Sequence, residues 1–157
     1  FTFSQEYKLS DKELIKTFKN IHKTDQSHIR DSSIRNTIFR TNFQTIVNII
    51  DIQGFPQLSQ YYKSKRKRNI IDGASQITFV HILQTKPELL LNEEMIYKFK
   101  SQITKSRINV NILSFALNIF NIDHSTQWCP NVWSEEVERC FHLAVKEWGI
   151  TLRDIKS

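Results

Sequence analysis

Glycine and proline are scarce in this sequence, and that scarcity most restricts the folds open to it. Only three glycines and three prolines occur in 157 residues. A sheet whose strands are joined by tight turns needs more of both, because glycine supplies positive φ angles and proline pre-sets a turn. Apolar residues recur instead at three- and four-residue spacing, which is typical of amphipathic helices. The sequence therefore predicts an all-α fold, a single irregular bundle of about six helices.

Capping signals indicate where several of these helices begin and end. Ser10 followed by Glu13 forms a capping box, which predicts a first helix from residue 11. A second apolar stripe extends over residues 34–50 and stops before the turn Gly54-Phe55-Pro56. We expect a loop or short helix up to Arg68, and a loop over 122–132. The other helices are expected over 73–84, after Thr85 and again after Asn92, over 110–120 as a buried helix, and from Ser134 to Gly149.

The length of the chain fits one domain with a sizeable core. Phe1-Thr2-Phe3-Ser4 resembles the last residues of a secretory signal peptide, so residues 5–157 would form the single helical domain. Export predicts a periplasmic or secreted protein. An ordinary apolar N-terminus and a cytoplasmic location are the alternative. No segment reaches the roughly 18 apolar residues of a transmembrane helix, so we expect no membrane span.

Two cysteines, Cys129 and Cys140, leave two states open. In an exported protein they would form one disulfide between the last helix and the loop before it. The alternative is two separate buried thiols. Neither cysteine has histidines at ligand spacing, so the sequence predicts no metal site. It also indicates no cofactor.

The formal net charge of +6 suits an anionic partner. Five cations gather in one basic run: Lys63, Lys65, Arg66, Lys67 and Arg68. Such a run binds phosphates, and the preceding tyrosines would stack on bases. A solvated loop is the simpler interpretation. For an exported protein, a lipid surface, an anionic polymer or a partner protein fits better than nucleic acid.

His81 is a polar residue in the most apolar helical stretch. Thr78, Gln84 and Thr85 share its helical face. A buried imidazole needs hydrogen-bond partners. The group is therefore either a self-satisfied core cluster or the floor of a polar pocket.

A second polar group lies near the end of the first helix. Asp25 and His28 are three residues apart, and Gln26 and Arg30 are four apart. An Asp–His pair can orient a general base. A surface pair or helix cap is the more common role of such residues. The five-residue spacing of Asp25 and Arg30 argues against an ion pair between them.

A third group, His124, Thr126 and Gln127, falls in the loop expected before the last helix. Loops on a rigid scaffold often hold binding sites. Trp128 and Trp133 either stack on a sugar or base, or simply fix this loop to the bundle.

Five short motifs follow one another along the chain. They are Asp25-Gln26 with Arg30, Gly54-Phe55-Pro56, His81 with Gln84, Thr126-Gln127, and the closing Trp148-Gly149-Ile150-Thr151-Leu152. In this order the sequence resembles a family of bacterial proteins known as domain of unknown function 6624. The resemblance spans most of the chain and implies a fold and a site location, without a chemistry. The pocket it implies would be lined by Asp25, Gln26, Arg30, His81, Gln84, Thr126 and Gln127.

Two functions remain open. The first is a binding or interaction module that uses the polar pocket or the basic run. The second is a small hydrolase-like or lyase-like enzyme, with His81 or His124 as acid and base and Arg30 as anion holder. No nucleophile stands out in the sequence, so we favour the binding module.

Overall fold

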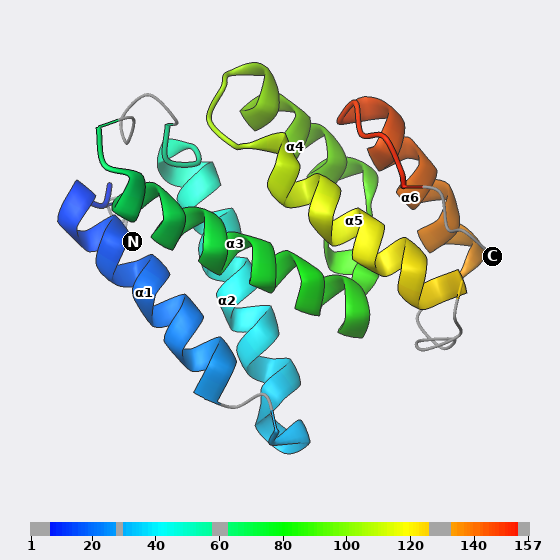
Figure 1. Ribbon diagram of the computed structural model, residues 1–157, viewed down its shortest axis with the longest axis horizontal. Helices are drawn as coiled ribbons and strands as arrows, with labels where there is room; N and C mark the ends of the chain where they lie inside the picture. Colours follow the sequence, from blue (N-terminus) through cyan, green and yellow to red (C-terminus); the bar gives the residue numbers. More distant parts are fainter. Residues whose placement is uncertain (1–6, 28–29, 58–62, 126–132, 154–157) are drawn as a thin grey trace, which may run out of the picture.

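The computed structural model describes residues 7–27, 30–57, 63–125 and 133–153, without the side chains of 124 and 125. These residues form six α-helices and one short 3-10 helix, and they contain no strand. The all-α prediction is confirmed (Figure 1). The elements are α1 (Asp11–Ser27), α2 (Ser32–Gln53), α3 (Lys65–Thr85), η2 (Pro87–Leu89), α4 (Glu93–Thr104), α5 (Val110–Ser125) and α6 (Glu135–Glu147).

Three helices begin at the N-terminal caps that the sequence predicts, and each cap forms its hydrogen bond. The Ser10 amide donates to Glu13 Oε2 at 2.8 Å, and the Glu13 amide donates to Ser10 Oγ at 3.3 Å. The Asn92 side chain accepts from the Met95 amide at 3.0 Å. The Ser134 hydroxyl accepts from the amide of residue 137 at 3.1 Å. Each contact satisfies an amide that has no partner within its own helix.

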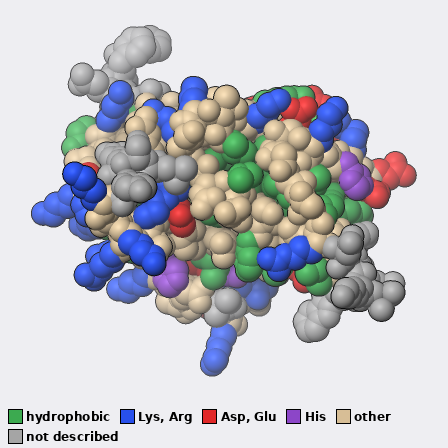
Figure 2. Space-filling view, turned by 45° about the horizontal axis from the view of Figure 1, so that its top comes forward, with side chains coloured by type: hydrophobic (Ala, Val, Ile, Leu, Met, Phe, Trp, Pro, Cys, Tyr) green, Lys and Arg blue, Asp and Glu red, His purple; other side chains and the backbone are tan. Residues whose placement is uncertain are grey.

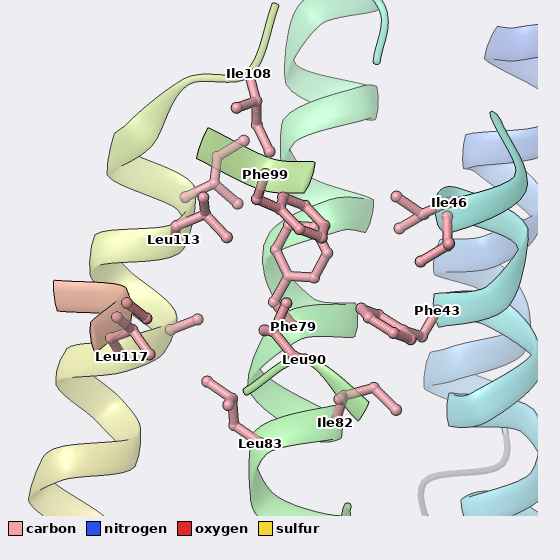
Figure 3. Packing of buried hydrophobic residues seen from close by; sticks show 14 of the residues in the cluster. Phe43, Ile46, Phe79, Ile82, Leu83, Leu90, Phe99, Ile108, Leu113 and Leu117 are labelled. Carbon is pink, nitrogen blue, oxygen red and sulfur yellow. The ribbon is translucent and has the colours of Figure 1, made fainter. Parts of the chain in front are cut away.

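Helix α3 lies at the centre of the bundle and packs against α1, α2 and α5. Phe79 of α3 is fully buried and meets Phe99 of α4 edge to face, with ring centroids 5.3 Å apart. Phe43 of α2 approaches the same ring from the other side at 6.3 Å (Figure 3). This aromatic core fixes the position of α3, and with it the side chains that α3 presents to α1.

Two predicted boundaries are wrong. Helix α3 begins at Lys65 rather than near residue 73, because Ser64 caps it and accepts a hydrogen bond from the Lys67 amide. The basic run from Lys65 to Arg68 is therefore helical and not a loop. Helix α5 continues to Ser125, beyond the predicted loop start at 122. Residues 122–125 contain no glycine or proline that would end a helix, which is consistent with this extra turn.

Two apolar residues that the patterns assigned to buried faces are exposed. Ile34 near the start of α2 is 39% exposed, and Phe115 on α5 is 42% exposed. Ile34 lies in the first turn of α2. Helix α5 is thus buried on one side only.

The Gly54-Phe55-Pro56 turn ends α2 as predicted. Gly54 has φ of +79°, a conformation that favours glycine. A Cβ there would also lie 2.8 Å from the Arg107 side chain, which crosses the turn. Arg107 donates to the Phe55 carbonyl oxygen at 3.2 Å, and the Phe55 amide donates to Gln102 Oε1 at 2.9 Å. The turn is therefore fixed against the segment that follows α4.

Cys140 is a buried free thiol in α6, and burial raises its pKa. This matches the separate-thiol alternative for Cys140, while Cys129 lies outside the described residues. In the part of the chain that is described, no helix is long and apolar enough to cross a membrane.

Candidate functional site

Two contacts join α1 and α3, each between an aspartate of α1 and a basic side chain of α3. Both have the same residue offset between the two helices. Near their starts, Lys67 Nζ lies 2.8 Å from Asp11 Oδ2. Fourteen residues further along each helix, His81 Nδ1 lies 3.0 Å from the Asp25 carboxylate. Both pairs are 56 residues apart in sequence, so the two helices run in the same direction (Figure 1). Fourteen residues make about four helical turns, or about 21 Å. We call Asp11–Lys67 the outer contact and Asp25–His81 the inner contact.

A groove of about 610 Å³ lies between α1 and the first half of α3. Its lining residues come from both helices. They are Lys19 and His22 of α1, and Lys65, Arg66, Asn69, Ile70, Gly73 and Ala74 of α3. A second hollow of about 380 Å³ shares Lys19 and adds Lys12 and Lys16. Lys and Arg side chains gather at this end of the molecule (Figure 2). We call the first hollow the basic groove.

The basic run divides into two groups once it is helical. Lys67 pairs with Asp11, and Arg68 pairs with Asp72 through Nε at 2.9 Å and a second nitrogen at 2.8 Å. Burial raises the pKa of Asp72, although the Arg68 guanidinium opposes that shift. Lys67 and Arg68 are therefore already paired with carboxylates of the protein.

Three cations line the groove, Lys65 and Arg66 of the basic run and Lys19 of α1. Among the described residues, Lys65, Arg66 and Lys19 form no ion pair with a carboxylate. All three side chains are exposed. Their like charges repel one another across the groove. An anion placed there would relieve this repulsion. Lys63 lies in the turn before the groove and does not line it.

The floor of the basic groove is apolar. Ala74 is fully buried, and Ile70 packs on the hydrophobic core. Gly73 between them is exposed and carries no side chain. The groove thus combines a cationic rim with an apolar floor, a combination that suits a small organic anion.

The inner contact is the second candidate site. Asp25 has no exposed surface, and the His81 side chain is only 12% exposed. Gln26 Nε2 also donates to Asp25 Oδ1 at 3.1 Å. Phe39 of α2 stacks on the imidazole, with centroids 4.2 Å apart and planes 20° apart. The carboxylate and the ring together set the orientation of His81.

The two nitrogens of His81 differ in their surroundings. Nδ1 faces the Asp25 carboxylate, which favours the tautomer that carries its proton on Nδ1. Within the described residues, Nε2 has no hydrogen-bond partner. An imidazole oriented in this way can accept or donate a proton at Nε2. The His81 side chain of the inner contact is therefore oriented as general acid–base catalysis requires.

The side chains expected to surround the imidazole satisfy other groups. Thr85 Oγ1 donates to the His81 carbonyl oxygen at 2.7 Å, and Thr78 Oγ1 donates to the Ala74 carbonyl oxygen at 2.8 Å. Gln84 Nε2 donates to Asp123 Oδ2 of α5 at 2.9 Å. Of the two alternatives for this group, the self-satisfied cluster with Thr78, Gln84 and Thr85 does not form, because the partner of the imidazole comes from α1.

The structure brings together only part of the predicted pocket. Asp25, Gln26 and His81 meet, whereas Gln84 bonds to α5. Arg30 is exposed in the turn after α1 and, among the described residues, has no ion pair with Asp25. His28, Thr126, Gln127 and Trp128 lie outside the described residues, as does the side chain of His124. The convergence of Arg30 and Gln127 on this site therefore stays a prediction.

Sequence reasoning missed Lys19, His22, Phe39 and Asp123. Lys12, Lys16, Lys19 and Lys23 do recur at helical spacing along α1, and this stripe was a usable signal. The pairing of that stripe with the basic run depends on the parallel arrangement of α1 and α3. Nothing in either segment alone indicates that arrangement.

The described residues contain no cluster of three or more His, Cys, Asp or Glu side chains that could hold a metal ion. Comparisons with protein-family models, with curated proteins and with solved structures found no match to this chain. The resemblance to domain of unknown function 6624 therefore stays a prediction. The candidate function has to be argued from the geometry of the two sites.

Proposed function

We propose that this protein is a binding module that holds an anionic ligand in the basic groove between α1 and α3. One observation carries the proposal. Lys19, Lys65 and Arg66 line a groove of about 610 Å³ without a carboxylate partner among the described residues. The volume is that of a small-molecule site, which spans about 300–1,000 Å³ in most proteins.

The charge arrangement supports an anion rather than a neutral ligand. The three cations come from two helices that the outer and inner contacts hold in register. Their spacing is therefore set by the fold and not by flexible loops. Hydrogen bonds between oppositely charged groups are shorter and stronger than those between neutral groups, so these three exposed cations gain more from an anion than from a neutral ligand. A phosphate or carboxylate group is the natural ligand for such a rim.

Binding of inorganic pyrophosphate tests the proposal. We expect saturable binding by titration calorimetry at low salt, weakening as the salt concentration rises, since mobile ions screen exposed charges. The variant Lys65→Gln/Arg66→Gln should lose affinity by at least about tenfold, which corresponds to about 1.4 kcal/mol.

A matched control separates a local effect from a change in net charge. Lys105→Gln/Lys146→Gln also removes two exposed cations, but neither lines the basic groove. This control should bind pyrophosphate like the unmodified protein. Equal losses in both variants, or no saturable binding at all, would contradict the proposal.

An acid–base enzyme is the second candidate function. The observation in its favour is the inner contact, in which a sealed carboxylate orients His81 while Nε2 keeps no partner among the described residues. Such an enzyme would take its substrate beside His81 rather than in the basic groove. The place where a ligand binds therefore separates the two functions.

The prediction of export is independent of both candidates. Residues 1–4, on which it rests, lie outside the described residues. An anionic ligand does not identify a compartment, so the groove chemistry favours neither export nor a cytoplasmic location.

A further inference from the structure

Gly73 occupies an unfavourable place for glycine. It lies inside α3, away from both ends of a 21-residue helix. In a helix interior glycine is the least favourable residue after proline, because it loses the most backbone freedom on folding. A glycine in such a place usually permits a close approach of another group.

None of the described residues makes that close approach. A Cβ built at Gly73 would meet no atom within 4 Å. Gly54 shows the contrasting case, since a Cβ there would lie 2.8 Å from Arg107. Packing thus explains Gly54 but does not explain Gly73.

The position of residue 73 in the basic groove explains why a glycine is found there. Gly73 lies between Ile70 and Ala74 on the groove floor. Without a side chain, it leaves a strip of helix surface open against which a ligand can lie. From Arg66 to Gly73 the helix rises by about 10 Å. A ligand that reaches both ends is therefore larger than a simple inorganic anion.

Polar groups at the groove indicate the chemistry of the part of the ligand that lies beyond its anionic group. Asn69 of α3 and His22 of α1 both line the groove. An alkyl chain lying there would cover these groups without giving them hydrogen bonds, which is unfavourable. A flat heterocycle offers an apolar face to Ile70 and Gly73, and its edge offers acceptors and donors to Asn69.

We infer that the basic groove binds an organic phosphate with a flat heterocyclic ring, such as a nucleoside monophosphate, with its ring over Gly73 and its phosphate at Lys65 and Arg66. This inference rests on the proposed function, which requires only an anion. It adds that Gly73 makes room for the ring. Gly73 therefore determines specificity for the ring of the ligand and not for its charged group.

Titrations with four probes test the inference. Adenosine 5′-monophosphate should bind at least tenfold more tightly than inorganic pyrophosphate, because the floor contributes only to the first. It should also bind at least tenfold more tightly than adenosine, which lacks the charge, and than hexyl phosphate, which lacks the ring.

Two variants at Gly73 then separate folding from binding. Gly73→Ala should raise the melting temperature by about 2–4 °C, since alanine favours the helix and meets no neighbour. Gly73→Leu should stay folded but fill the floor. It should lower the affinity for adenosine 5′-monophosphate at least tenfold, and this loss should exceed the loss for pyrophosphate, which has no ring to place on the floor.

The outcomes separate the two proposals. Equal affinities for adenosine 5′-monophosphate and pyrophosphate would overturn the ring inference and leave the anion site standing. Tighter binding of hexyl phosphate would overturn it in favour of an alkyl ligand. An unchanged affinity in Gly73→Leu would also overturn it. If neither phosphate probe binds, the proposed function and the inference fail together. The probe comparison needs only the unmodified protein, so it decides the inference even if a variant does not fold.

Discussion

The outer and inner contacts join the same two helices in the same register, yet their surroundings differ. In the outer contact, Lys67 and Asp11 are 46% and 39% exposed. In the inner contact, His81 is 12% exposed and Asp25 is sealed. An exposed ion pair contributes little, because water solvates both groups well when they separate. A sealed carboxylate that loses its partner has no such alternative.

This difference assigns the two ends of the α1–α3 contact to different tasks. The exposed end lies beside cations that have no carboxylate partner among the described residues, and it is open to a ligand. The sealed end holds the helices in register, and so fixes the spacing of those cations. The basic groove therefore depends on a polar pair that does not line it.

The largest expected effect is at the inner contact. His81→Leu should lower the free energy of unfolding by about 3–5 kcal/mol, because it leaves the sealed Asp25 carboxylate with a single side-chain donor among the described residues, the Gln26 amide. Urea unfolding measures this change. A loss below about 1 kcal/mol would mean that the inner contact is no stronger than a surface pair.

The charge of Asp25 provides the control for this variant. Asp25→Asn alone should destabilise by about 1–2 kcal/mol, since it weakens the hydrogen bond to His81. In the His81→Leu background the same change should stabilise the protein, because it removes an uncompensated buried charge. A change of the same sign in both backgrounds would show that the carboxylate charge is not what His81 offsets.

The smallest expected effect is at the outer contact. Lys67→Gln should change the free energy of unfolding by less than about 1 kcal/mol, and the difference should shrink at high salt. The same urea experiment applies. A loss as large as that of His81→Leu would remove the distinction between the two contacts.

The sequence predicted the helices and their caps better than it predicted which side chains contact one another in the fold. Ser10, Asn92 and Ser134 were identifiable as caps because a cap bonds to residues three positions away. His81 was identifiable as a polar residue in an apolar segment. Its partner Asp25 lies 56 residues away, and only the packing of α1 on α3 brings the two together.

The basic run shows the same limit. Its composition indicated an anion site, but its five cations looked equivalent. The fold assigns Lys67 and Arg68 to carboxylates and directs Lys65 and Arg66 into the groove. Which cations are paired depends on where Asp11 and Asp72 lie, and for Asp11 that position follows from tertiary packing alone. Asp72 was four residues from Arg68, a spacing that already favours an ion pair on a helix.

The most direct test of this account is to map where pyrophosphate binds. In a titration followed by two-dimensional amide nuclear magnetic resonance, we expect the largest shifts at Lys19, His22 and the α3 segment from Lys65 to Gly73. The amides of Asp25, Phe39 and His81 should shift little. Shifts concentrated around His81, with none in the basic groove, would contradict the account and favour the acid–base site.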